Sequence, residues 1–119
     1  MIITMLKSKI HRATVTGADV DYEGSITIDK KLMDAAKLIE YEQVDIYNIN
    51  NGQRFTTYVI KGKRGKGEIC LNGAAARLVS IDDLIIICSY SHHAEKEIGK
   101  HKPVIVHVDE KNKVIEIKG

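Results

Sequence analysis

Long apolar runs are missing from this chain, and the longest are short stretches such as Leu-Ile-Ile-Ile-Cys at 84–88. A membrane-spanning helix needs about 20 apolar residues, so the sequence predicts no such helix. The first residues carry no basic region ahead of their apolar part and no small-residue cleavage site, so we also expect no signal peptide. The expectation is a cytoplasmic protein without a membrane partner.

Cysteine and proline are scarce. The two cysteines, Cys70 and Cys88, each lie in an apolar, strand-like run. They predict reduced, buried thiols, because a disulfide or a metal pair needs more support than two isolated residues give. Pro103 is the only proline. With no linker and no convincing repeat, the chain is expected to form a single domain over 1–119.

An excess of charge is absent too, since 18 basic and 16 acidic side chains leave a formal net charge of +2. A nucleic-acid-binding domain usually shows a clustered basic face, so the charge gives no reason to expect such a partner. The remaining composition, 44% hydrophobic and 29% charged, is typical of a globular domain.

Strand-like segments make up most of the chain, because β-branched residues are frequent and often alternate with polar ones. Asn51-Gly52 predicts a tight hairpin turn between two of these strands. Strict alternation within the first strand would place Ile10 and Ala13 on opposite faces. The expected strands cover 2–16, 25–28, 44–49, 54–60, 68–72 and 84–91, followed by a hairpin over 102–117.

Helical signal is weak and local. Residues 30–40 place Leu32, Ala35, Ala36 and Ile39 on one apolar stripe, and Asp29 before them is a candidate N-cap. Two further short helical turns are expected, over 73–80 and 94–99. Many short strands with a few small helices favour a compact, mainly β barrel over a layered α/β sheet.

Two motifs that could bind a ligand have simpler explanations. Gly-Lys-Arg-Gly-Lys-Gly at 62–67 lacks the spacing of a phosphate-binding loop and is interpreted as a solvated hairpin loop. Adjacent histidines on a strand point to opposite faces, and no carboxylate or cysteine completes a ligand set. We therefore expect an exposed, mobile segment and no metal site around His92, His93, His101 and His107.

Arg54, Thr56 and Tyr58 share one face of an expected strand. An arginine beside a tyrosine suggests an anion site next to a proton donor or acceptor, although an outward polar face is the commoner arrangement. Downstream, Asn72-Gly73 precedes three alanines. These small residues either leave backbone N–H groups open to a ligand at the start of a short helix or simply form a turn.

The Gly24-Ser25 pair permits an unusual reaction. If the turn is strained, the Ser25 hydroxyl can attack the Gly24 carbonyl and shift the acyl group from nitrogen to oxygen. Elimination and hydrolysis would then leave a pyruvoyl group at a new N-terminus. Gly-Ser turns are common, so these two residues alone do not decide between a bend and a break.

Five spaced motifs run in order along the chain. They are Lys-Ile-His-Arg at 9–12, Tyr-Glu-Gly-Ser at 22–25, Asp-Ala-Ala at 34–36, Asn-Gly-Gln-Arg-Phe-Thr-Thr-Tyr at 51–58 and Asn-Gly-Ala-Ala-Ala-Arg-Leu at 72–78. Together they resemble the bacterial aspartate α-decarboxylases, collinearly from Met1 to about Tyr90. Five motifs in order are far more specific than any one of them, and after Tyr90 the likeness fades.

The resemblance implies a mainly β fold, a double-ψ β-barrel with a few short helices, assembled as a homotetramer. It implies self-cleavage between Gly24 and Ser25 into residues 1–24 (the β chain) and 25–119 (the α chain). Ser25 would become a pyruvoyl cofactor that forms a Schiff base with the substrate. The implied enzyme is a carboxy-lyase that converts L-aspartate to β-alanine and CO₂ and so supplies pantothenate and coenzyme A biosynthesis.

Roles at single positions also follow from the resemblance. Tyr58 matches the proton donor, and Arg54 and Lys9 match the basic residues associated with the substrate carboxylates. No metal is implied. The matching substrate-binding positions are Thr57 and the backbone of Gly73, Ala74 and Ala75, and the positions that line the site are His11, Tyr22 and Asn72.

Two alternatives to the enzyme stay open at the level of sequence. One is a non-enzymatic β-barrel module that binds nucleic acid or protein, through the basic residues of 9–12 and 62–67. The other is a structural homologue that keeps the barrel and never matures. The sequence also leaves open whether maturation is autonomous or needs a partner protein.

Overall fold

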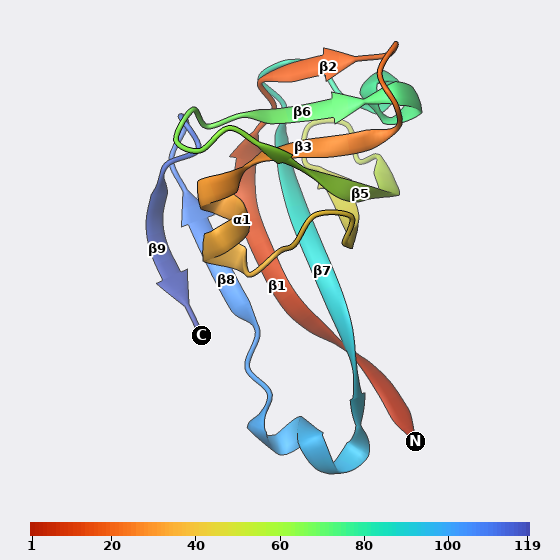
Figure 1. Ribbon diagram of the computed structural model, residues 1–119, viewed down its shortest axis with the longest axis vertical. Coiled ribbons are helices and arrows are strands. Elements are labelled where there is room, and N and C mark those ends of the chain that lie inside the picture. Colours follow the sequence, from red (N-terminus) through yellow and green to blue (C-terminus); the bar gives the residue numbers. More distant parts are fainter.

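Nine strands and three short helices make up the computed structural model, which describes residues 1–119 (Figure 1). The helical elements are α1 (Lys30–Ala36) and the 3₁₀ helices η1 (Gly73–Leu78) and η2 (Glu95–Lys100). The strands are β1 (Ile2–Thr14), β2 (Gly17–Asp19), β3 (Ser25–Asp29), β4 (Gln43–Asn48), β5 (Arg54–Gly62), β6 (Ile69–Asn72), β7 (Leu84–Ala94), β8 (Val104–Val108) and β9 (Val114–Lys118). The prediction of a mainly β chain with a few short helices is confirmed.

All strands belong to one sheet in the order β2-β6-β3-β5-β4-β7-β1-β8-β9. β1 and β2 are first neighbours in the chain, separated only by Val15 and Thr16, yet they stand seventh and first in this order. The sheet must therefore curl, so that β2 comes back toward the end of β1. In the connection between these two strands, the Thr16 N–H donates to the Ile69 carbonyl at 2.8 Å. The parallel pairs β1–β8, β2–β6 and β3–β5 each need a crossover connection, because a tight hairpin cannot join parallel strands.

The core lies inside the curled sheet and consists of aliphatic side chains from most of its strands. Eighteen buried hydrophobic residues form one cluster. Each large aliphatic side chain buried there contributes about 1.5–3 kcal/mol of transfer free energy, so this cluster is the main stabilising feature. Its fully buried isoleucines are Ile10, Ile26, Ile28, Ile46, Ile69, Ile85 and Ile87.

The expected alternation along β1 is wrong at one point. Ile10 and Ala13 are both 0% exposed, although strict alternation would separate them. The pairing of β1 with β7 shifts register between these two residues, and Arg12 has φ +64°. An irregularity of this kind adds a residue to one strand and returns the next side chain to the same face.

α1 begins as predicted and ends early. The Asp29 carboxylate accepts the Lys31 N–H at 2.8 Å, which confirms the N-cap. The helix stops at Ala36 because Lys37 adopts a left-handed conformation, φ +58°, and its N–H bonds back into the last turn. This turn buries Leu38 and leaves Ile39 69% exposed, so the predicted extension to residue 40 is wrong.

The basic loop at 62–67 is not a hairpin loop, contrary to expectation. β5 and β6 do not pair with each other, because both pair with β3, one on each side. The loop is held by the Asp29 carboxylate, which accepts the N–H groups of Gly65 at 2.9 Å and Gly67 at 2.7 Å. Local sequence cannot reveal this crossover, since the partner of the loop is the helix cap on another segment.

Asp29→Ala should lower the free energy of unfolding by about 2–4 kcal/mol, because three backbone N–H groups lose a charged acceptor. Burial alone would raise the pKa of Asp29, but the N–H groups of Gly65, Lys31 and Gly67 lower it below its ordinary value. This stabilisation should therefore be present above about pH 4 and be lost as the pH falls further. Urea unfolding at several pH values measures it, and Asp29→Asn, which keeps an acceptor, should lose less than Asp29→Ala.

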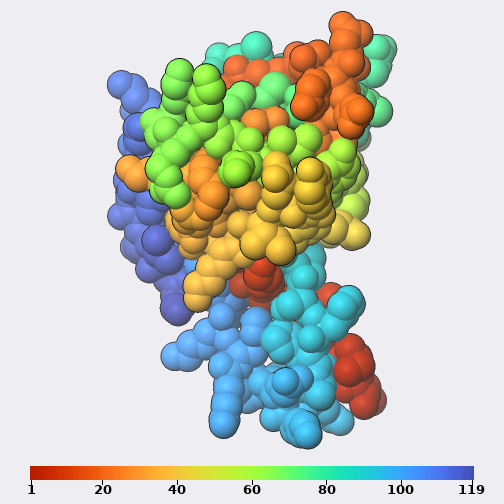
Figure 2. Space-filling model, viewed as in Figure 1, coloured from red at the N-terminus to blue at the C-terminus, as the bar shows by residue number.

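The two remaining predicted hairpins are confirmed: β4 pairs antiparallel with β5 across Asn51-Gly52, and β8 with β9. The N-terminal half of β1 and the C-terminal half of β7 extend beyond the rest of the sheet as a two-stranded ribbon, with η2 at its tip (Figures 1 and 2). His92 and His93 lie on this ribbon, and the His93 ring packs 4.5 Å from that of His101. The structure shows no group of three metal-ligating side chains and no helix long and apolar enough to cross a membrane.

Candidate active site

Ser25 is the first residue of β3 and is 0% exposed, whereas Gly24 before it is exposed. The Ser25 hydroxyl donates to the Glu23 carbonyl at 2.9 Å and accepts an N–H from the Asn72 side chain at 2.9 Å. Ser25 and Asn72 are also opposite each other in the β3–β6 pair. The strand register thus holds a serine hydroxyl in a fixed, desolvated position beside the exposed Gly24 turn.

Asn72 is buried and its amide is fully hydrogen-bonded. Besides Ser25, its N–H groups reach the Thr27 hydroxyl at 3.0 Å, and its oxygen accepts the Cys70 thiol at an S···O distance of 3.4 Å. Sequence reasoning found Asn72 through the family resemblance but missed Thr27 and Cys70. Alternation was the signal that could have found both residues. Residues 70 and 72 share one face of β6, and residues 25 and 27 share one face of β3.

The close packing of η1 against the Gly24-Ser25 turn requires a glycine at position 73. Its φ is +68°, and a side chain there would begin 2.6 Å from the Gly24 Cα and 3.0 Å from the Tyr22 carbonyl. Gly24 itself has open space around it and no positive φ, so the backbone conformation that favours glycine occurs at Gly73 and not at Gly24. The start of η1, with Ala74 exposed and Ala75 half-buried, thereby packs directly against the turn.

Thr57 and Tyr58 lie on β5, the strand next to β3. Ile26 pairs with Val59 in parallel register, so Tyr58 stands one residue earlier, beside Ser25. Tyr58 is half-buried, and its ring lies 6.3 Å from that of Tyr41 across a shallow hollow that Thr57 also lines. β5 therefore brings two of the predicted residues to the Gly24-Ser25 turn.

Lys9 and Arg54 form a second group on the same outer face. Lys9 is opposite Cys88 in the β1–β7 pair, and the Arg54 guanidinium lies 4.1 Å from the centre of the Tyr47 ring. Burial raises the pKa of the Cys88 thiol, and the nearby cations of Lys9 and Arg54 oppose that rise. Two predicted basic residues thus share one patch, and Arg54 is four strand positions, roughly 13 Å of backbone, from Tyr58.

His11 lies apart from the Ser25 turn. It pairs with His107 of β8, and the two rings meet edge to face at 5.4 Å. Burial, followed by the charges of His107 and Lys9, lowers the pKa of His11 below its ordinary value. None of the contacts of this ring reaches the Ser25 turn, so within one chain the structure places His11 near Lys9 but does not bring it to Ser25.

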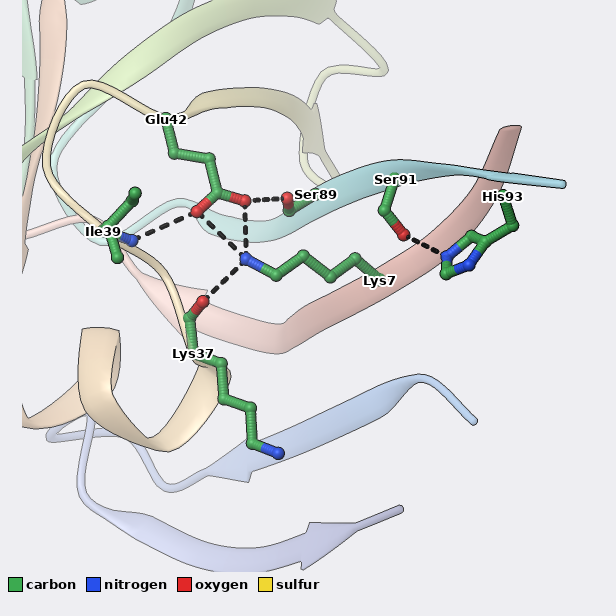
Figure 3. A network of polar contacts seen from close by, with 7 residues as sticks. All are labelled: Lys7, Lys37, Ile39, Glu42, Ser89, Ser91 and His93. Atoms are coloured by element: carbon green, nitrogen blue, oxygen red, sulfur yellow. Dashed lines mark hydrogen bonds and ion pairs between the residues drawn. The ribbon is translucent and has the colours of Figure 1, made fainter. Parts of the chain in front are cut away.

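A half-buried ion pair between Lys7 and Glu42, which no local sequence pattern predicts, holds the segment that leads into β4 (Figure 3). The Lys7 ammonium lies 2.9 Å from the Glu42 carboxylate and also donates to the Lys37 carbonyl at 2.7 Å, while the Ser89 hydroxyl donates to Glu42. Burial would raise the pKa of Glu42, but these hydrogen bonds lower it below its ordinary value. The Glu42 carbonyl in turn accepts the Val59 N–H at 3.0 Å, which fixes β5 next to Tyr58.

A curled β domain with a buried serine at an exposed glycine turn, and with a tyrosine and two cations on the same face, has the features of a small enzyme. Residues 1–115 match the family model described as aspartate decarboxylase, and the chain belongs to this family of carboxy-lyases.

Curated relatives are similar over nearly the whole chain. The aspartate 1-decarboxylase of Acetivibrio thermocellus is 62% identical over 118 residues, which cover 99% of this chain and 94% of that protein. The aspartate 1-decarboxylase of Ralstonia pickettii is 58% identical over 114 residues, 96% of this chain and 95% of the relative. That of Wolinella succinogenes is 57% identical over 118 residues, 99% and 98% of the two chains.

Among solved structures, that of a rationally designed protein, mkDPBB_sym_86, superposes with a TM-score of 0.49. The two chains are 14% identical, and the match covers 66% of this chain and 91% of the designed one.

Proposed function

We propose that this chain decarboxylates L-aspartate to β-alanine and CO₂ after cutting itself between Gly24 and Ser25. Family membership and the name of the relatives support the reaction. The observation that carries the proposal is the Ser25 hydroxyl, which is buried, doubly hydrogen-bonded and adjacent to an exposed glycine peptide.

The cut uses atoms of the chain and one water. The Ser25 oxygen attacks the Gly24 carbonyl carbon, the C–N bond breaks, and an ester with a free Ser25 amine results. Loss of the Ser25 Cα proton and cleavage of the Cβ–O bond release Gly24 as a carboxylate and leave dehydroalanine. Its imine tautomer takes up water and releases ammonia, which leaves a pyruvoyl group at position 25 of the chain 25–119.

The residues around Ser25 fit such a group, since Gly73 packs against the turn without a side chain and Asn72 and Thr27 offer hydrogen bonds. The pyruvoyl carbonyl supplies an electron sink for the electrons left at Cα when CO₂ departs. Tyr58, beside Ser25, would deliver a proton to that carbon.

The remaining predicted residues would bind the substrate. Arg54 and Lys9 would hold its carboxylates, for which a planar guanidinium is well suited. The backbone of residues 73–75, together with Thr57, would contact the rest of the substrate, with Tyr22 at the rim. The resemblance also supports assembly into a homotetramer, which would bring His11 to this site. Help from a maturation partner and a cytoplasmic location are further proposals.

Intact mass spectrometry of the purified protein tests the proposal. It should show a fragment of residues 1–24 and a fragment of 25–119 that is lighter by one ammonia than the same fragment with an intact serine. The sample is incubated warm, both alone and with an extract of the source cells, so that a missing maturation partner cannot hide the cut. A single uncut mass in both samples would contradict self-cleavage.

A further inference from the structure

The orientation of the Asn72 amide depends on one donor. Both of its N–H groups are committed, to the hydroxyls of Ser25 and Thr27, and its oxygen has a single donor in the chain, the Cys70 thiol. Asn72 is 3% exposed, so solvent contributes little. Without the thiol, a buried carbonyl oxygen would lose its only hydrogen bond within the chain.

The two ends of a side-chain amide have nearly the same shape, so their partners decide which way the amide faces. Turned over, the Asn72 oxygen would face the Ser25 oxygen, whose proton is directed to the Glu23 carbonyl. The NH₂ group would then face sulfur, which is a weak acceptor. A thiol that donates therefore favours the orientation in which Asn72 donates to Ser25.

Cys70 is held in position beside Asn72, and its thiol stays protonated. A side chain at Gly17 would begin 3.1 Å from the Cys70 sulfur, so β2 bounds the thiol on one side. Burial, then the carboxylates of Glu68 and Asp19, raises the pKa of Cys70 above its ordinary value. At neutral pH the sulfur keeps its proton and remains a donor.

We propose that Cys70 is a positioning residue for self-cleavage, because its S–H group holds the Asn72 amide so that Asn72 fixes the Ser25 hydroxyl before the bond breaks. This rests on the proposed function. The thiol touches none of the reacting atoms and acts only through Asn72. A residue that can donate at position 70 should therefore support cleavage, and one that cannot should slow it.

The test follows the rate of cleavage by intact mass in freshly translated protein. Cys70→Ala should cut about three- to tenfold more slowly than wild type, the effect expected from losing one weak neutral hydrogen bond. Cys70→Ser, which restores a donor, should cut within about twofold of wild type. Cys88→Ala removes the other thiol, which lies on β7 and not beside Asn72, and should leave the rate unchanged.

Two measurements separate positioning from a general loss of packing. The thermal midpoints of the position-70 variants, taken on a Ser25→Ala background that cannot cut, should not follow their cleavage rates. In an Asn72→Ala background, Cys70→Ala should add no further slowing, because the residue through which it acts is gone.

Equal rates for wild type and Cys70→Ala, equal slowing in Cys70→Ser, or undiminished slowing without Asn72 would each overturn the inference while leaving the proposed function intact. A wild-type chain that never cuts would refute both.

Discussion

Ser25→Ala is expected to give a full-length, folded chain with no decarboxylase activity. The substitution removes the attacking oxygen, so neither the ester nor the group derived from it can form. Folding should survive, since the lost hydroxyl makes two hydrogen bonds worth about 1 kcal/mol each and Asn72 keeps its contact with Thr27. A denaturing gel, a thermal melt and an assay of β-alanine formation from aspartate measure the three parts of this result.

Ser8→Ala is the matched control for that experiment. Ser8 is also a buried serine on a strand, but its hydroxyl has no hydrogen-bond partner, so removing it should cost little or nothing. This variant should cut and catalyse like wild type. If Ser25→Ala still yields two fragments, or still forms β-alanine, Ser25 is not the source of the reactive group.

Tyr58→Phe separates the catalytic role of the phenol from its packing. If the hydroxyl protonates Cα, the rate of β-alanine formation should fall by about 10²–10⁴-fold, equivalent to about 3–5 kcal/mol of barrier. Cleavage at Ser25 should continue, because the acyl shift uses the serine hydroxyl and not the phenol. The extent of cleavage on a gel and the steady-state rate with aspartate together report the outcome.

Tyr41→Phe supplies the comparison for this second variant. Tyr41 is exposed, its ring lies 6.3 Å from that of Tyr58, and no role is proposed for its hydroxyl. It should therefore change the rate by no more than about twofold. A Tyr58→Phe enzyme that cuts normally and works at the wild-type rate would leave protonation to water or to another side chain.

Local signals in the sequence predicted individual elements well. Asn51-Gly52 marked the β4–β5 hairpin because few residue pairs suit the tight turn, and Asp29 marked the start of α1 because its carboxylate can cap the first N–H groups. The same logic failed where one residue changed the backbone. Positive φ at Arg12 and at Lys37 has no sequence signature as clear as a glycine, so the register of β1 and the end of α1 were misjudged.

Non-local partners were the main limit. Nothing in residues 62–67 reveals that Asp29 binds their N–H groups, and nothing around Glu42 reveals Lys7 as its partner. The candidate site also contains residues that the sequence identifies and one that only the structure reveals. The family resemblance supplied Ser25, Asn72 and Tyr58 by position, but Cys70 became visible only when the β6 register placed its thiol against Asn72.

The central place of β1 has a consequence for how a cut protein would behave. β1 lies between β7 and β8 and contributes Ile10 and Ala13 to the core, so the segment 1–24 would remain bound after cleavage. Thermal unfolding of the cut protein would then separate two polypeptides, so its midpoint temperature would rise with protein concentration. Each precursor subunit would refold from one chain after denaturation, whereas the two fragments of a matured subunit would have to find each other again in a second-order reaction.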